Sequence, residues 1–253
     1  MRILANGLSA LADLVYPPRC VACGRWGAWL CPACQQAAIR LAPPWCARCG
    51  RPLAAPGLCR RCRQNVGALA AIRSVSPYQW PLREAIHALK YEGLRALASP
   101  LGAMLAACWQ AANLPGDLIV PVPLHPVRLR QRGYNQSTLL ARECAQHSQV
   151  PWADGILRRV RDTPSQVGLS RSARRRNVQG AFQCGAERPA GREIILVDDV
   201  LTTGATLEAC ASALLAAGAH SVRALTLARA VDPRSRPSAT PWPAGPYSCG
   251  GRQ

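Results

Sequence analysis

Two adjacent carboxylates and a run of small hydroxyl residues give residues 194–206 (IILVDDVLTTGAT) the clearest capacity for chemistry in this chain. Asp198 and Asp199 can accept hydrogen bonds from the vicinal hydroxyls of a sugar. The loop that follows combines one glycine with small side chains, so backbone N–H groups can approach an anion while the hydroxyls add donors. Its members are Thr202, Thr203, Gly204, Ala205 and Thr206. The stretch predicts a site for a phosphorylated sugar.

The elements around this stretch must bring its two halves together. The apolar run 194–197 is typical of a strand covered on both faces, as in a parallel sheet flanked by helices. Ligands of open α/β sheets bind at the carboxyl ends of such strands. Leu207, Cys210 and Leu214 keep helical spacing, and the N-terminus of that helix would favour a phosphate. The alternative is an ordinary strand, turn and helix with a solvated acidic turn.

Eight of the 13 cysteines form four CxxC pairs, which can complete two four-cysteine zinc sites. The pairs are Cys20 with Cys23, Cys31 with Cys34, Cys46 with Cys49, and Cys59 with Cys62. The intervals of 7, 11 and 9 residues fit two consecutive zinc ribbons, and an interleaved arrangement fits them as well. A redox CxxC would need a βαβ setting, and a disulfide framework would need export. Metal removal is expected to unfold residues 20–62 and to leave the larger domain that follows largely intact.

Several separate motifs in this chain resemble those of one family. Residues 194–206 resemble the phosphoribosyl pyrophosphate (PRPP) signature of type I phosphoribosyltransferases. Further motifs, in the expected order, are 120–125 (VPVPLH), 132–136 (RGYNQ) and 163–182 (TPSQVGLSRSARRRNVQGAF). With the cysteine-rich N-terminus, the chain resembles the ComF competence family over about residues 14–230.

The resemblance implies roles for individual residues. Asp198 and Asp199 would bind the ribose hydroxyls, and residues 202–206 would bind the 5′-phosphate. Mg²⁺ would accompany PRPP. The candidates for the pyrophosphate side are Pro121, Val122, Pro123, Arg130, Arg132 and Lys90, the only lysine of the chain. The candidates in a mobile loop that closes over the substrate are Gln166, Arg171, Arg175 and Asn177.

The expected fold class is α/β, with a type I phosphoribosyltransferase-like parallel sheet flanked by helices and preceded by a small zinc-ribbon domain. The expected division is a helix over 1–18, a double zinc ribbon over 19–65, a phosphoribosyltransferase-like domain over 66–231 and a disordered tail over 232–253. Strands are expected at 69–75, 118–122, 155–160 and 221–227, and helices at 82–91, 94–112 and 135–147. The chain has neither a cleavage site after its apolar start nor a charge-free run of about 18 apolar residues, which predicts a cytoplasmic protein without membrane insertion.

The formal net charge of +18 comes almost entirely from arginine. It fits either a solvated basic surface or a footprint for nucleic acid. Trp26, Trp29 and Trp45 can pack the ribbons or stack on bases. Two hypotheses therefore stand: a phosphoribosyltransferase linked to DNA uptake, and a non-catalytic PRPP sensor that binds single-stranded DNA. The sequence identifies neither the acceptor nor the oligomeric state.

Overall fold

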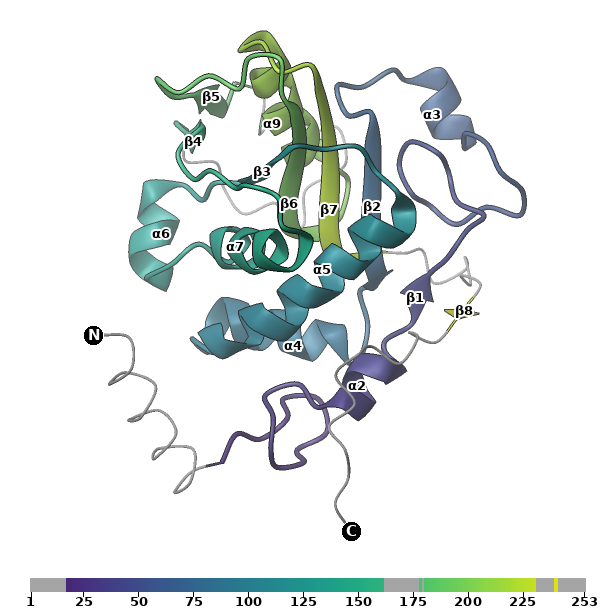
Figure 1. Cartoon of the computed structure of the whole chain (residues 1–253), viewed down its shortest axis with the longest axis vertical. Coiled ribbons are helices and arrows are strands. Elements are labelled where there is room, and N and C mark those ends of the chain that lie inside the picture. Colours follow the sequence, from purple (N-terminus) through teal and green to yellow (C-terminus); the bar gives the residue numbers. More distant parts are fainter. Residues whose placement is uncertain (1–16, 162–177, 179, 231–238, 241–253) are drawn as a thin grey trace.

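The computed structural model describes residues 17–161, 178, 180–230 and 239–240 of the 253-residue chain. Its centre is a parallel sheet with the strand order β2-β7-β6-β3, which Figure 1 shows edge to edge. The strands are β2 (Ala71–Pro77), β3 (Leu118–Pro121), β6 (Glu193–Leu201) and β7 (Ser221–Arg229). The apolar run 194–197 is buried on both faces of the sheet, as the sequence predicts.

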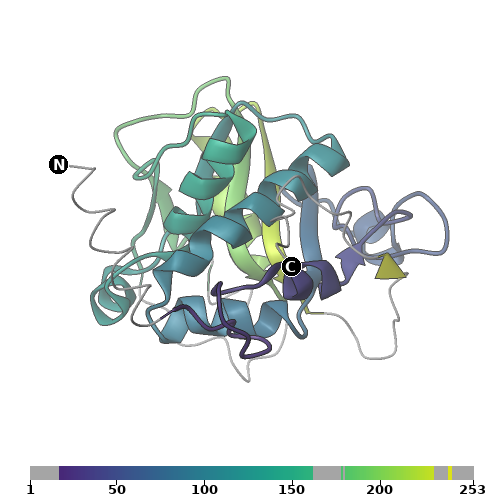
Figure 2. The ribbon, with the colours of Figure 1, turned by 60° about the horizontal axis from the view of Figure 1, so that its bottom comes forward.

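Helices cover both faces of this sheet. In Figures 1 and 2, α5 and α7 cross one face and α9 lies behind the other. The main helices are α4 (Leu82–Tyr91), α5 (Ala98–Ala112), α7 (Gln136–Ser148) and α9 (Ala205–Ala216). Shorter turns are η1 (Arg95–Leu97) and α6 (Pro126–Arg132). The predicted fold class is confirmed, with one hydrophobic core on each side of the sheet.

The cysteine-rich segment has little regular structure of its own. Its elements are α2 (Pro32–Ala37), β1 (Arg40–Leu41) and α3 (Arg60–Gln64). In Figure 1, α2 lies below the sheet near α4, whereas α3 lies beside the edge strand β2. Two further antiparallel pairs complete the fold: β4 (Leu157–Arg159) with β5 (Phe182–Cys184), and β1 with β8 (Ala239–Thr240).

Several predicted elements differ from those observed. The first sheet strand begins two residues later than predicted, and the strand predicted at 155–160 pairs with β5 in a hairpin outside the central sheet. Helix α6 is not among the helices expected from the sequence. Within the predicted disordered tail, Ala239–Thr240 form a strand, because the backbone of β1 offers them a pairing edge. The predicted helix over 1–18 and the mobile-loop candidates Gln166, Arg171, Arg175 and Asn177 fall outside the described residues, apart from Pro17 and Pro18, which are not helical.

Candidate functional site

The acid pair lies inside β6 rather than after it, because the strand continues to Leu201. Successive side chains of a strand point to opposite faces, so the two carboxylates have different neighbours. Both oxygens of Asp199 are occupied: Lys90 Nζ lies 2.6 Å from Oδ1, and Gln136 Nε2 donates to Oδ2 at 2.6 Å. Burial alone would lower the pKa of Lys90, but the Asp199 carboxylate outweighs it and raises that pKa. Asp199 thus acts as the partner of a buried ammonium.

Asp198 is the carboxylate that faces open space. Its Oδ1 accepts hydrogen bonds from Ser137 Oγ at 3.0 Å and from the backbone N–H of Asp199 at 2.9 Å. Burial, together with the neighbouring charge of Asp199, raises the pKa of Asp198 to about 7. Asp198 also lines a polar cavity of about 180 Å³. This carboxyl group is poised to change its protonation state when a ligand binds.

The connection between α6 and α7, residues 133–135, and the first two residues of α7 hold the acid pair in place. Gly133 ends α6 with a φ of 77°, in the left-handed region that favours glycine. The buried Tyr134 hydroxyl donates to the carbonyl of Leu89, the residue before Lys90. Asn135 caps α7 by accepting from the N–H of Ser137 at 3.1 Å, and donates to the carbonyl of Val122. The motif RGYNQ, predicted to line the pyrophosphate side, therefore orients both aspartates.

The cavity beside Asp198 gathers only part of the predicted set. Its walls are Val122, Pro123, Leu124, Arg128, Gln136, Ser137, Arg159, Asp198 and Thr206. Two predicted arginines lie elsewhere: Arg130 is exposed, and Arg132 donates to Gln136 Oε1 at 2.5 Å. Lys90 bonds Asp199 instead, and Pro121 is the last residue of β3.

Arg128 and Arg159 supply the guanidinium groups of this cavity instead. Arg128 belongs to the arginine cluster after VPVPLH and could have been chosen from the sequence. Nothing in the sequence points to Arg159, because only the pairing of β4 with β5 brings it to the cavity. There it is buried, and its guanidinium carbon lies 5.5 Å from the centre of the Phe182 ring.

The stretch 202–206 leads from β6 into α9, and Ala205 and Thr206 already belong to the helix. Gly204 has a φ of 82°, which favours glycine over any other residue at the N-cap of α9. The Thr203 hydroxyl accepts from the N–H of Ala205, the first residue of the helix, at 3.4 Å. Thr206 reaches the cavity beside Asp198, whereas residues 201–205 border a larger cavity of about 1050 Å³.

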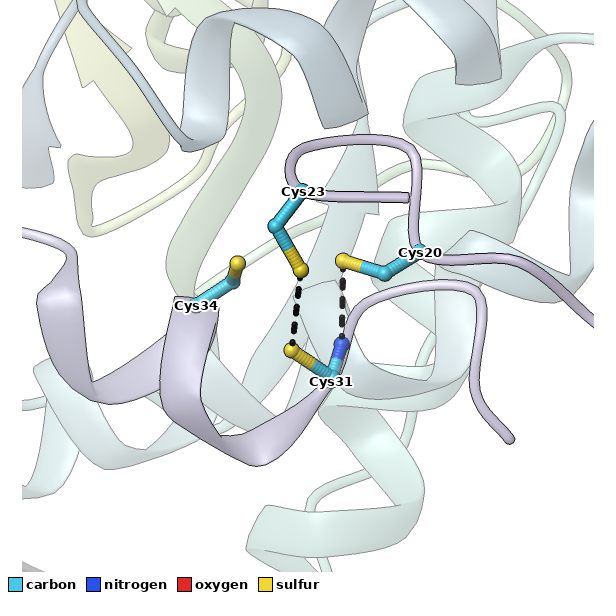
Figure 3. Close-up of side chains that lie close together, drawn as sticks. All are labelled: Cys20, Cys23, Cys31 and Cys34. Atoms are coloured by element: carbon cyan, nitrogen blue, oxygen red, sulfur yellow. Dashed lines mark hydrogen bonds between the residues drawn. The ribbon is translucent and has the colours of Figure 1, made fainter. Parts of the chain in front are cut away.

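The eight CxxC cysteines form two separate clusters in consecutive order, which excludes the interleaved arrangement. Within each cluster all Sγ atoms lie within 4.8 Å of one another: Cys20, Cys23, Cys31 and Cys34 in the first (Figure 3), Cys46, Cys49, Cys59 and Cys62 in the second. A tetrahedral site with Zn–S bonds of about 2.3 Å requires S···S separations of about 3.8 Å. The Sγ atoms of Cys23 and Cys31 are 3.6 Å apart, and those of Cys49 and Cys59 are 3.8 Å apart. Both clusters fit a four-coordinate zinc ion.

Equivalent contacts repeat in the two clusters. The N–H of Cys31 donates to Cys20 Sγ at 3.4 Å, as shown in Figure 3, and that of Cys59 donates to Cys46 Sγ at 3.4 Å. Burial alone would raise these pKa values, but the backbone N–H donors bring the pKa of Cys20 and of Cys46 to about 6. Each cluster thus contains one thiol that readily becomes the thiolate a metal needs.

Two family models match separate parts of this chain. A family model described as a double zinc ribbon domain matches residues 11–63, and one described as a phosphoribosyl transferase domain matches residues 138–244. The DNA utilization protein YhgH of Salmonella typhimurium is 37% identical over 217 residues, which cover 83% of this chain and 93% of that protein. Competence protein F of Haemophilus influenzae is 31% identical, covering 79% and 90%. Competence protein ComFC of Bacillus subtilis is 29% identical, covering 79% and 84%.

Fold and site together define a phosphoribosyltransferase-like protein with a double zinc ribbon at its N-terminal side. The sequence identity to relatives over most of both chains identifies the family more narrowly than the fold does. The chain belongs to the ComF family. Within the part of the chain that the structure describes, no helix is both long and apolar enough to cross a membrane.

Proposed function

We propose that this ComF-family protein binds PRPP with Mg²⁺ at the carboxyl edge of its sheet and transfers or hydrolyses the phosphoribosyl group, in a process linked to DNA uptake. One observation carries the proposal: a single small cavity is lined by the Asp198 carboxylate, the Thr206 side chain and two guanidinium groups. A ribose phosphate that carries pyrophosphate needs these three kinds of group.

The groups in and around this cavity each have a role in the proposal. Asp198 accepts hydrogen bonds from the ribose hydroxyls, and the loop 202–206 binds the 5′-phosphate with its backbone N–H groups and hydroxyls. Arg128 and Arg159 bind pyrophosphate, since guanidinium groups pair with phosphate oxygens in a bidentate manner. Asp199 holds Lys90 and Gln136 and keeps β6 aligned with α4 and α7.

The reaction is a displacement at the anomeric carbon. The bond from this carbon to the pyrophosphate oxygen breaks, pyrophosphate leaves with the electron pair, and an acceptor nucleophile or water forms the new bond. Positive charge builds on the sugar ring, as in glycosyl transfer in general, and Asp198 lies where it can stabilise that charge. Mg²⁺ bound with PRPP would neutralise the negative charge of the leaving pyrophosphate. Asp198 is the carboxylate that would bind this hard cation together with the oxygens of the substrate.

Each cysteine cluster is proposed to hold one structural Zn²⁺. The separations of the Sγ atoms and the N–H donors to Cys20 and Cys46 support this assignment. A segment this short buries little apolar surface, so the metal supplies much of its folding free energy.

A second candidate function is a PRPP sensor that binds single-stranded DNA without turnover. Relatives named for DNA utilization and competence favour a role with DNA. The surface favours it too: the guanidinium carbon of Arg19 lies 3.7 Å from the centre of the Trp26 ring, and Trp26 is 55% exposed. An exposed aromatic ring with a cation over it is a platform on which an unpaired base can stack.

The experiment is to measure pyrophosphate release from Mg·PRPP with a panel of bases, with single-stranded DNA and with water alone. Calorimetry of PRPP binding runs beside it, with Asp198→Asn as the control. Release that the control lacks supports a transferase or hydrolase. Binding without release under every condition favours the sensor. No PRPP binding by the unaltered protein refutes both.

A further inference from the structure

The second cysteine cluster contacts the loop that is proposed to bind the 5′-phosphate. Arg61 lies on α3 between two cysteines of that cluster, Cys59 and Cys62. Its Nη2 donates to the backbone carbonyl of Thr203 at 3.3 Å, across 142 positions of sequence. A metal bound by Cys59 and Cys62 would fix α3 on both sides of Arg61 and thereby fix this hydrogen bond.

The segment that follows α3 makes a second connection to the same loop. Glu208, in the first turn of α9, accepts from the N–H groups of Ala68 at 2.7 Å and Leu69 at 3.3 Å. The approach at residue 67 is so close that a Cβ added to Gly67 would lie 2.4 Å from Glu208 Oε1. The beginning of α9, which ends the phosphate loop, is therefore tied to the backbone just after the second cluster.

Arg48 completes this connection from within the second cluster. It lies between Cys46 and Cys49, and its guanidinium donates to three backbone carbonyls of alternate residues, those of Asn65, Gly67 and Leu69. The second cluster therefore holds segment 65–69, and that segment holds Glu208. Two routes, through Arg61 and through Arg48, join the metal-binding cysteines to residues 202–208.

The first cluster is anchored in a different place. Cys20, Cys31 and Cys34 share a hydrophobic core with α4 and α5. The indole N–H of Trp80 donates to the carbonyl of Ala22 at 3.0 Å and ties the first cluster to the segment before α4. Two clusters of the same ligand set thus support two different parts of the fold.

We propose that the second cluster positions the phosphate loop, so that PRPP affinity depends on metal at Cys46, Cys49, Cys59 and Cys62 through the positioning residue Arg61. Arg61 keeps the Thr203 carbonyl engaged with α3, which leaves the N–H groups of the loop to face the anion. The dependence on PRPP rests on the proposed function. The coupling between cluster and loop does not, because it is a property of the unliganded chain.

The test uses the full chain with zinc bound and compares Arg61→Ala with Arg63→Ala, since Arg63 is an exposed arginine of the same helix. Amide hydrogen exchange of residues 202–206 should become faster in Arg61→Ala and stay unchanged in Arg63→Ala. PRPP affinity by calorimetry should fall about 3- to 10-fold in Arg61→Ala only, as expected for one lost hydrogen bond. Arg61→Lys should recover part of both effects.

A second part of the experiment removes one metal-binding cysteine from each cluster in turn. Cys62→Ser should accelerate exchange at 202–206, whereas Cys23→Ser, in an exposed ligand of the first cluster, should not. Equal exchange at 202–206 in Arg61→Ala and Arg63→Ala overturns the coupling, whether or not PRPP binds. Faster exchange in Arg61→Ala with no PRPP binding by the unaltered protein supports the coupling and refutes the proposed substrate.

Discussion

The two cysteine clusters have the same ligands and the same internal hydrogen bonds, yet their surroundings are opposite. In the first, three of the four cysteines are buried and pack in the core that holds Leu30, α4 and α5. In the second, only Cys46 is buried, and the cluster is bordered by arginines. The ligand set therefore predicts the metal but not its role, which depends on what each ribbon packs against.

Charge explains why arginines gather around the second cluster. A Zn²⁺ ion with four thiolates carries a net charge of about −2. Arg73 and Arg229 are buried on the two strands at this edge of the sheet, and their guanidinium groups donate to the carbonyls of Ala47 at 3.1 Å and Cys49 at 2.8 Å. Burial lowers the pKa of both side chains. A metal-loaded second cluster offsets the cost of burying these two cations.

The largest expected effect is on stability, at the first cluster. Cys34→Ser should lower the free energy of unfolding by about 4 kcal/mol or more, since it removes a buried ligand and leaves the core around α4 without its metal-bound neighbour. Urea denaturation followed by circular dichroism measures this. Cys144→Ala, which truncates a buried cysteine outside both clusters, is the matched control and should cost about 1 kcal/mol.

This shared core changes what metal removal should do. The sequence predicts that chelation unfolds residues 20–62 and leaves the rest of the chain largely intact. Cys20, Cys31 and Cys34, however, pack in one core with α4 and α5, so loss of metal is expected to destabilise those helices as well. Equal and small losses in Cys34→Ser and Cys144→Ala would mean that the first cluster is not a structural site.

A second test separates the two aspartates. Asp199→Asn leaves the Lys90 ammonium without its carboxylate and should cost about 3 kcal/mol of stability, as expected when one partner of a buried ion pair is removed. Asp199→Asn with Lys90→Met should regain part of this loss, because the unpaired charge is gone. Asp198→Asn should not lower the unfolding free energy near neutral pH, because it removes a carboxyl group whose ionised form the folded protein disfavours. Similar losses in both single variants would contradict the division of roles.

The third expected effect is a pH dependence at Asp198. The pKa of Asp198 is raised from its ordinary value of 3.8 to about 7, so the unliganded protein loses stability as pH rises from about 4 to about 7, where the folded protein still holds the proton and the unfolded chain does not. Ribose hydroxyls and Mg²⁺ favour the ionised carboxylate, so PRPP affinity should fall by up to about tenfold for each pH unit below 7. Calorimetry between pH 5.5 and 8 checks this. Asp198→Asn should bind about 10- to 100-fold more weakly at pH 8 and show only the pH dependence of PRPP itself. A wild-type profile no steeper than that of Asp198→Asn would contradict the assignment.

The sequence predicts much of this architecture and little of its side-chain pairing. Buried strands, the phosphate loop and CxxC spacing are local patterns, so β6, α9 and the two clusters could be anticipated. Lys90 and Asp199 are 109 positions apart, and Arg61 and Thr203 are 142 positions apart. Arg159 and Asp198, which line the same cavity, are 39 positions apart. Local sequence patterns carry no signal over such separations. Arg130 and Arg132, predicted for the pyrophosphate side, do not line the small cavity because they lie on α6, and a helix turns alternate arginines to different sides. Their role stays a prediction.

The last expected effect sharpens the comparison at the outer surface of the first ribbon. With a formal charge of +18, the chain should bind single-stranded DNA with an affinity that falls steeply with salt, by a slope of about −0.7 per phosphate neutralised. Trp26→Ala should weaken binding by about 1 to 3 kcal/mol without changing that slope, because a stacked base contributes no counterion release.

A triple change at Arg174, Arg175 and Arg176 tests the phosphate contacts separately. These three arginines lie outside the described residues, and their removal should reduce the slope by up to about 2 if they contact phosphates. Fluorescence anisotropy at several salt concentrations measures both, with the exposed Arg83 as control. If Trp26→Ala leaves the affinity unchanged, the stacking platform on the first ribbon is wrong, and the arginine-bordered second ribbon and the cavity beside it become the next surface to test.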